Sequence, residues 1–99
     1  MEQNKIVSVT NQKTLADGAS TPHIGHLNLK LMRRHVDKLT HATDERLIFW
    51  MKFIGERCKM IIEPTGVLGL VGLENLINEG AIKDGARIGI ILTGGNVDL

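Results

Sequence analysis

Aromatic residues are scarce in this 99-residue chain, which has no tyrosine, two phenylalanines and one tryptophan. Hydrophobic residues still make up 42% of the sequence, so its core must be mainly aliphatic. A chain of this length can enclose one small core and is too short for the two-domain architectures common among cofactor enzymes. We therefore expect residues 1–99 to form at most one domain.

An excess of one charge is also lacking, because 12 basic and 11 acidic residues leave a net charge of +1. Nucleic-acid-binding proteins carry a basic patch or stripe, so no nucleic-acid partner is expected. No apolar run approaches the roughly 20 residues of a bilayer-spanning helix, and the N-terminus lacks the apolar stretch of a secretory signal. The single Cys58 cannot form an internal disulfide, which suits a reducing compartment. The composition predicts a cytoplasmic protein with no membrane partner.

One helix is strongly marked, over residues 44–57. Thr43 is a favoured N-cap residue, and Asp44 and Glu45 follow it in the first turn, where the helix dipole favours negative charge. Apolar residues then recur at intervals of three and four, as on the buried face of a helix: Leu47, Met51, Ile54 and Cys58.

A second helix is predicted over residues 65–78, which are apolar on nearly all sides up to Glu74. Helices of this kind are covered by other structure on several sides. Gly66, Gly69 and Gly72 lie on one side of it, and each costs about 1 kcal/mol relative to alanine unless close packing offsets the loss. We therefore expect backbone from elsewhere in the chain to approach this glycine face.

Short apolar runs between turn residues predict strands. There are four such runs: residues 6–9, 36–40, 60–62 and 88–92. Pro64 ends the third because proline cannot continue a central ladder, and the fourth has the composition of a strand buried on both faces of a parallel sheet. A short helix is expected over residues 28–35. Because strands and helices alternate, the predicted fold class is α/β.

A glycine-rich turn, Thr93-Gly94-Gly95-Asn96, follows the last predicted strand. In open α/β sheets, ligands bind outside the carboxyl ends of strands, and paired glycines let backbone approach a ligand ring or phosphate. A tight turn after a core strand is the structural alternative. The turn alone does not decide between the two.

Three segments together resemble the motifs of one family. They are TLADG (residues 14–18), KMIIEPTG (residues 59–66) and LTGGNVDL (residues 92–99). The first is similar to a Thr-Ile-Ala-Asp-Gly motif, and the other two to the closing motifs, of the fold-type II pyridoxal-phosphate enzymes that include serine racemases and serine/threonine dehydratases. The segments occur in family order, and the resemblance covers about residues 5–99. It implies an incomplete part of the doubly wound large domain of such an enzyme.

The resemblance also implies a cofactor-binding set of Thr93, Gly94 and Gly95, with pyridoxal phosphate as the cofactor. Thr93 takes the place of a hydroxyl residue, usually serine, that hydrogen-bonds to the pyridine nitrogen. A hydroxyl can donate to a neutral ring nitrogen without holding it protonated, unlike a carboxylate. Threonine keeps this chemistry and adds a methyl group.

A second implied set consists of Lys59, Glu63 and Asn96, which match positions near an ATP site of nucleotide-activated relatives such as serine racemase. ATP and magnesium are thus implied as ligands of full-length relatives. Ordinary structural roles are the alternative, with Lys59 as a charge at a strand entry and Glu63 as an acid at a helix N-terminus. His23 and His26 have no Cys or carboxylate cluster beside them, so no metal site is predicted.

Two parts of the family's chemistry have no counterpart in these residues. The family's Schiff-base lysine lies in a Ser-x-Lys segment, and none of the seven lysines has that context. The glycine loop that holds the cofactor phosphate is likewise missing, because Gly66, Gly69 and Gly72 are dispersed along a predicted helix. We therefore predict no catalytic residue in the chain and negligible turnover by these residues alone.

The resemblance thus implies a serine/threonine dehydratase or serine racemase-like protein reduced to its C-terminal part, with small amino acids as the family's substrates. Three alternatives stay open: a non-catalytic partner of a full-length relative, a nucleotide-binding module, and an inactive remnant of a broken gene. The apolar helix at 65–78 needs more cover than 99 residues provide. Self-association or a missing N-terminal portion is therefore predicted.

Overall fold

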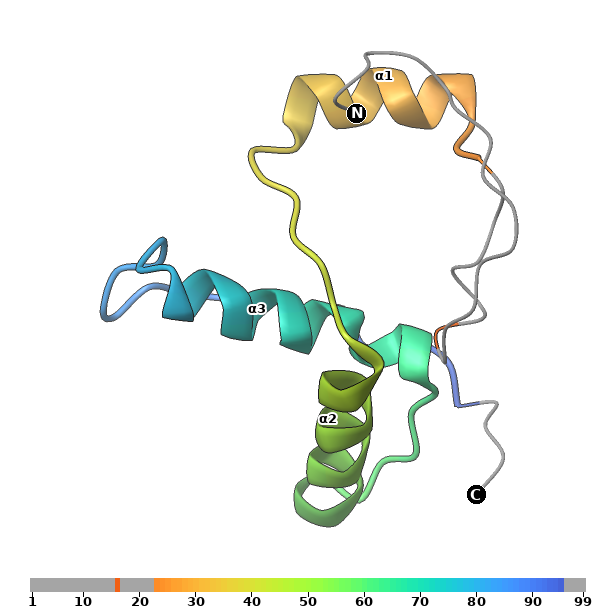
Figure 1. Ribbon diagram of the computed structural model, residues 1–99, viewed down its shortest axis with the longest axis vertical. Coiled ribbons are helices and arrows are strands. Elements are labelled where there is room, and N and C mark those ends of the chain that lie inside the picture. Colours follow the sequence, from red (N-terminus) through yellow and green to blue (C-terminus); the bar gives the residue numbers. More distant parts are fainter. Residues whose placement is uncertain (1–15, 17–22, 96–99) are drawn as a thin grey trace.

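The computed structural model of the chain describes Ala16 and residues 23–95. The helical elements of these residues are α1 (His26–His35), α2 (Asp44–Arg57), the 3-10 turn η2 (Pro64–Val67) and α3 (Leu68–Asn78). Figure 1 shows that α2 and α3 run at a steep angle to each other from the region of η2. None of the helices in the described part of the chain is long and apolar enough to cross a membrane.

Helix α2 has the bounds that the sequence predicts. The Thr43 side chain accepts a hydrogen bond from the backbone N–H of Arg46 at 3.3 Å and so caps the first turn. Leu47 and Ile54 are buried. Cys58, however, is exposed, so its predicted place on the buried face is wrong. The helix ends at Arg57, and Cys58 lies at its C-cap rather than on its apolar stripe.

The second predicted helix is confirmed, with a different first turn. Residues Pro64–Val67 form a 3-10 turn that continues into α3. Proline suits this first position because its missing N–H would have no partner there. The elements α2, η2 and α3 pack on one another around a core that consists of Ala16, Leu47, Ile54, Ile62, Val67 and Val71.

Helix α1 lies apart from this core. It begins at His26, two residues before the predicted start, and packs against no other helix of the described chain (Figure 1). Leu27 and Leu31 on it are exposed. The radius of gyration is 14.8 Å, compared with about 13 Å for a compact domain of this length. The arrangement is therefore open and leaves apolar side chains in solvent.

The strands predicted at 36–40, 60–62 and 88–92 are not formed in the described residues, so the structure does not show the predicted α/β class. The run at 6–9 lies outside the described residues. A strand exists only where a ladder of hydrogen bonds joins it to a neighbour. Among the described residues, a single backbone hydrogen bond, from the Glu63 N–H to the Gly94 carbonyl at 2.9 Å, joins the flanks of the last two runs. Ile91 is 83% exposed.

The glycine face of η2 and α3 is covered closely, as predicted. A Cβ atom on Gly66 would overlap the carbonyl of Thr93. A Cβ on Gly69 would lie 3.0 Å from the Ile90 side chain, and one on Gly72 would lie 3.4 Å from the Thr40 methyl group. The segment that leads to Thr93 therefore lies along this face. The cost of the glycines is offset because only they permit such an approach.

A polar cluster joins α2 to α3 beside the core. The Trp50 indole N–H donates to Glu74 Oε2 at 2.6 Å, and Arg46 Nη2 lies 2.8 Å from Glu74 Oε1. The hydrogen bond from Trp50 and, after it, that from Arg46 hold the pKa of Glu74 below its usual value, against the smaller opposing effect of burial. The ionised carboxylate therefore stabilises the crossing of the two helices.

We expect Glu74→Gln to lower the stability of the chain by roughly 1 kcal/mol at neutral pH, because charged hydrogen bonds stabilise more than neutral ones. A lowered folded-state pKa contributes stability above the unfolded value, about 4.3, that is lost as the pH falls through the folded value. Thermal unfolding followed by circular dichroism should thus show the two proteins converging in acid. Glu79→Gln is the control, since Glu79 pairs with Lys38 where both side chains are about half exposed. An equal loss in both variants would contradict this account.

Candidate cofactor-binding site

The residues Thr93, Gly94 and Gly95 lie in an exposed segment outside any helix, here called the Thr93 turn after the turn predicted from the sequence. Gly94 has a φ of +73°, a backbone conformation that residues other than glycine adopt only with strain. The Thr93 side chain makes no hydrogen bond with any described residue. Its hydroxyl is thus not engaged by the described part of the chain.

Residues 61–66 hold the Thr93 turn from one side. The Glu63 N–H donates to the Gly94 carbonyl at 2.9 Å, and the Glu63 side chain fills the space that a Cβ on Gly94 would need. A Cβ on Gly95 would lie 3.1 Å from the Ile61 carbonyl. The turn is therefore fixed by short contacts that depend on its glycines.

The structure brings together some of the predicted site residues and separates others. Glu63, assigned to the nucleotide set, lies against Gly94 of the cofactor set. Lys59 is exposed, has a φ of +58° and forms no ion pair with Glu63. Asn96 lies outside the described residues. The predicted nucleotide set is therefore not shown as one site.

Gly66, which the sequence placed only on a packing face, contacts the Thr93 turn. Its lack of a side chain allows the Thr93 carbonyl to lie against it. Next to it, the Thr65 hydroxyl oxygen is buried and has no hydrogen-bond partner among the described residues. A buried polar atom of this kind is costly, so a polar group is expected to reach it. The three-residue glycine spacing was the only signal for the contact with Thr93.

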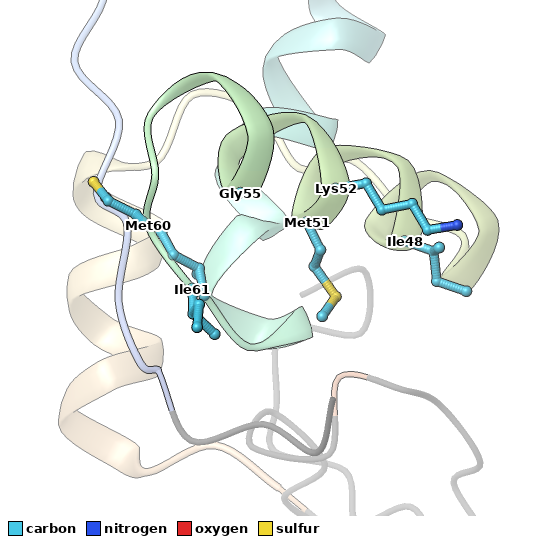
Figure 2. A pocket seen from close by; sticks show the side chains of 7 residues that line it. Ile48, Met51, Lys52, Gly55, Met60 and Ile61 are labelled. Carbon is cyan, nitrogen blue, oxygen red and sulfur yellow. The ribbon is translucent and has the colours of Figure 1, made fainter.

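An apolar hollow of about 280 Å³ lies between α2 and the segment that follows it (Figure 2). Figure 2 shows the Met51 and Ile61 side chains beside this space, with the Lys52 chain along α2. The hollow is lined by Ile48, Met51, Lys52, Gly55, Met60, Ile61 and Ile62. It offers one ammonium group and no carboxylate, hydroxyl or imidazole, so its own side chains supply no acid–base pair.

No three His, Cys, Asp or Glu side chains gather into a metal site within Ala16 and residues 23–95. His23 and His26 are both exposed, and the Nδ1 atom of His23 lies 3.2 Å from the Ile24 carbonyl. The Thr93 turn instead offers a hydroxyl and two glycines without side chains. It therefore suits a ligand that accepts a hydrogen bond and packs against backbone.

Comparison with known proteins shows the family. The family described as "Pyridoxal-phosphate dependent enzyme" matches residues 1–94. The chain belongs to this family. The membership predicted from the three motifs is thereby confirmed.

The chain is similar to L-threo-3-hydroxyaspartate ammonia-lyase of Pseudomonas sp, with 41% identity over 98 residues, 99% of this chain and 30% of the relative. It is 38% identical over 97 residues to serine racemase of Schizosaccharomyces pombe, covering 98% of this chain and 29% of the relative. The chain thus spans about 30% of the length of these curated relatives.

The described fold also matches a solved structure, the crystal structure of serine racemase from Dictyostelium discoideum. The TM-score is 0.79 at 31% identity, covering 99% of this chain and 30% of that one. The chain therefore has the fold of one part of a fold-type II pyridoxal-phosphate enzyme. The alternatives of a non-catalytic partner and a nucleotide-binding module are not favoured by these relatives.

Proposed function

We propose that this chain forms one wall of the cofactor site of a pyridoxal-phosphate-dependent ammonia-lyase or racemase that acts on serine, threonine or a related hydroxylated amino acid. The observation that carries the proposal is the exposed Thr93 hydroxyl on a turn that residues 61–66 hold in place. The similarity to a hydroxyaspartate ammonia-lyase and to serine racemases supports the substrate class.

The residues of the Thr93 turn fit the cofactor. The Thr93 hydroxyl would donate a hydrogen bond to the pyridine nitrogen, and Gly94 and Gly95 would leave bare backbone against the ring. When bound, pyridoxal phosphate withdraws electrons from the α carbon of the amino acid. A hydroxyl partner, unlike a carboxylate, does not hold the ring nitrogen protonated. Thr93 would therefore moderate this withdrawal.

We further propose that residues 1–99 are the C-terminal segment of the large domain of a cytoplasmic enzyme, in which residues 60–62 and 88–92 are strands. The exposed Ile61 and Ile91 side chains support this, since strands of a parallel sheet are covered on both faces. Residues outside this chain, or self-association, would supply the cover. The 99 residues alone would not turn over substrate, because they contain neither the Schiff-base lysine nor the phosphate loop.

Lys59, Glu63 and Asn96 are proposed as contributors to an ATP and magnesium site of the whole enzyme. The exposed ammonium of Lys59 is suited to a phosphate. Isothermal calorimetry with magnesium-ATP tests this set in the chimera described below. If Lys59→Ala leaves the affinity for magnesium-ATP unchanged, Lys59 does not belong to the set.

A chimera tests the proposed function. Residues 1–99 replace the matching 30% of Dictyostelium discoideum serine racemase, and the release of oxo acid and of D-serine from L-serine is measured with pyridoxal phosphate and magnesium-ATP. We expect the chimera to be active and the separate 99-residue chain to be inactive. The grafted enzyme supplies the lysine and the phosphate loop, whereas this chain supplies the Thr93 turn.

The parent racemase, purified in the same way, is the control for this experiment. A chimera that folds like its parent, yet neither binds the cofactor nor releases oxo acid, would contradict the proposed function. Turnover by the 99 residues alone would contradict the requirement for the lysine and the loop.

A further inference from the structure

Glu63 lies where two parts of the candidate site meet. It is the last residue before η2, and its carbonyl accepts the Gly66 N–H at 2.9 Å, which closes the first turn of that element. Its own N–H donates to Gly94 in the Thr93 turn. A single residue therefore links the start of η2 to the turn that carries the Thr93 hydroxyl.

The side chain of Glu63 acts on the same turn by its shape. Its carboxyl group and Cγ occupy the volume beside the Gly94 Cα where a side chain at that position would lie. Glu63 forms no ion pair with any described Lys, Arg or His. The contact with Gly94 is thus steric, and an uncharged side chain of equal length should preserve it.

Gly66, three residues after Glu63, limits the neighbouring position of the Thr93 turn. The Thr93 carbonyl lies so close to Gly66 that no Cβ fits between them. Thr93 and Gly94 are therefore held at consecutive backbone positions, one by contact with Gly66 and the other by Glu63. A turn fixed at two adjacent residues has little freedom to rotate the intervening peptide, and so the direction of the Thr93 Cα–Cβ bond is restricted.

We propose that Glu63 is a positioning residue for the Thr93 turn, acting through steric contact with Gly94 rather than through its charge. This inference rests on the proposed function for its catalytic meaning, since the turn would present its hydroxyl to the cofactor. The contact itself does not depend on the cofactor, and it can be tested without it.

The test compares Glu63→Ala with Glu63→Gln in the full 99-residue chain by nuclear magnetic resonance. Exchange of the Glu63 amide hydrogen reports its bond to Gly94, and the amide shifts of Thr93, Gly94 and Gly95 report the turn. We expect Glu63→Ala to speed the exchange by up to about tenfold, the equivalent of one backbone hydrogen bond, and to move the three amide shifts. Glu63→Gln should restore both readouts. Similar values for wild type and Glu63→Ala would overturn the proposal.

A double-mutant cycle gives an independent measurement of the same contact. Gly94→Ala should disturb the chain more than Gly80→Ala, because Gly80 has the same φ of +73° with nothing within 4 Å of its would-be Cβ. Removing the Glu63 side chain makes room, so Gly94→Ala should cost less in the Glu63→Ala background than in wild type. Additive effects would overturn the steric contact.

Addition of pyridoxamine 5′-phosphate to the cofactor-free chimera described above, whose grafted part supplies the phosphate loop, separates this inference from the proposed function. The probe has no aldehyde and cannot form Schiff bases with surface lysines. Shifts at the Thr93 turn upon addition, reduced in Glu63→Ala and restored in Glu63→Gln, support both. No shift at the turn in any variant, together with the expected exchange difference, would contradict the cofactor role of Thr93 and support the positioning role of Glu63.

Discussion

Replacing Leu47 with alanine is expected to lower the free energy of unfolding by about 3 kcal/mol, the cost of removing a fully buried leucine. Leu47 is 1% exposed and belongs to the core that α2 forms with η2 and α3. Small domains are stable by only about 5–15 kcal/mol, and α1 packs against no other helix among the described residues. The loss is therefore a large share of the total stability of the chain.

Urea unfolding followed by far-ultraviolet circular dichroism measures this loss. Ile48→Ala is the matched control, because Ile48 is the next residue on α2, is 41% exposed and also loses a branched aliphatic side chain. We expect it to cost less than about 1 kcal/mol, the range for surface positions. Equal losses of unfolding free energy in the two variants would show that α2 does not pack on η2 and α3 through Leu47.

Replacing Thr93 with valine in the chimera is expected to lower kcat about tenfold, since removal of one hydrogen bond costs on the order of 1 kcal/mol. Valine has the shape of threonine without its hydroxyl, so the substitution tests the proposed donor alone. Thr93 is exposed, and its side chain has no hydrogen-bond partner among the described residues. The change should therefore leave the stability of the chain within about 0.5 kcal/mol of wild type.

Thr93→Ser is the matched control for this prediction because serine keeps the hydroxyl and loses only the methyl group. It should retain activity within about twofold, a difference well below one hydrogen bond. The visible absorbance of the bound cofactor should differ from that of the unsubstituted chimera in the valine variant and be unchanged in the serine variant. Equal activity of the valine and serine variants would remove Thr93 from the cofactor site.

Helix α2 could be predicted from the sequence because its signals are local. The Thr43 cap, the acidic first turn and the apolar stripe of α2 all lie within one segment, and the structure reproduces its bounds, Asp44–Arg57. The helix predicted over 65–78, which the structure forms as η2 and α3, rested on a run that is apolar on nearly all sides. Only its 3-10 first turn, which follows Pro64, was not expected.

Strand formation could not be predicted from local signals alone. The apolar runs at 60–62 and 88–92 have the composition of strands, but strand formation requires neighbours that pair with them. In the described structure the two runs share a single flanking hydrogen bond. The two segments are apolar, but the strands predicted from that composition are not formed in the described residues.

The candidate site was predictable in part. Motif resemblance predicted Thr93, Gly94 and Gly95 as the cofactor-binding set, which stays a prediction; the structure shows that the three residues are exposed. The contact of Glu63 with Gly94 joins residues 31 positions apart in the chain, and no local pattern specifies such a pair. The glycine spacing predicted that backbone would approach Gly66 but not that the backbone would be that of Thr93.

The crystal structure of the chimera with pyridoxal phosphate tests the central claim most directly. The distance to measure is that between Thr93 Oγ1 and the pyridine nitrogen of the cofactor. We expect a hydrogen bond, with the two atoms about 2.7–3.2 Å apart, and the ring lying against Gly94 and Gly95. A bound cofactor whose ring nitrogen lies away from Thr93, beyond hydrogen-bond distance, would contradict the assignment of the Thr93 turn to the cofactor site.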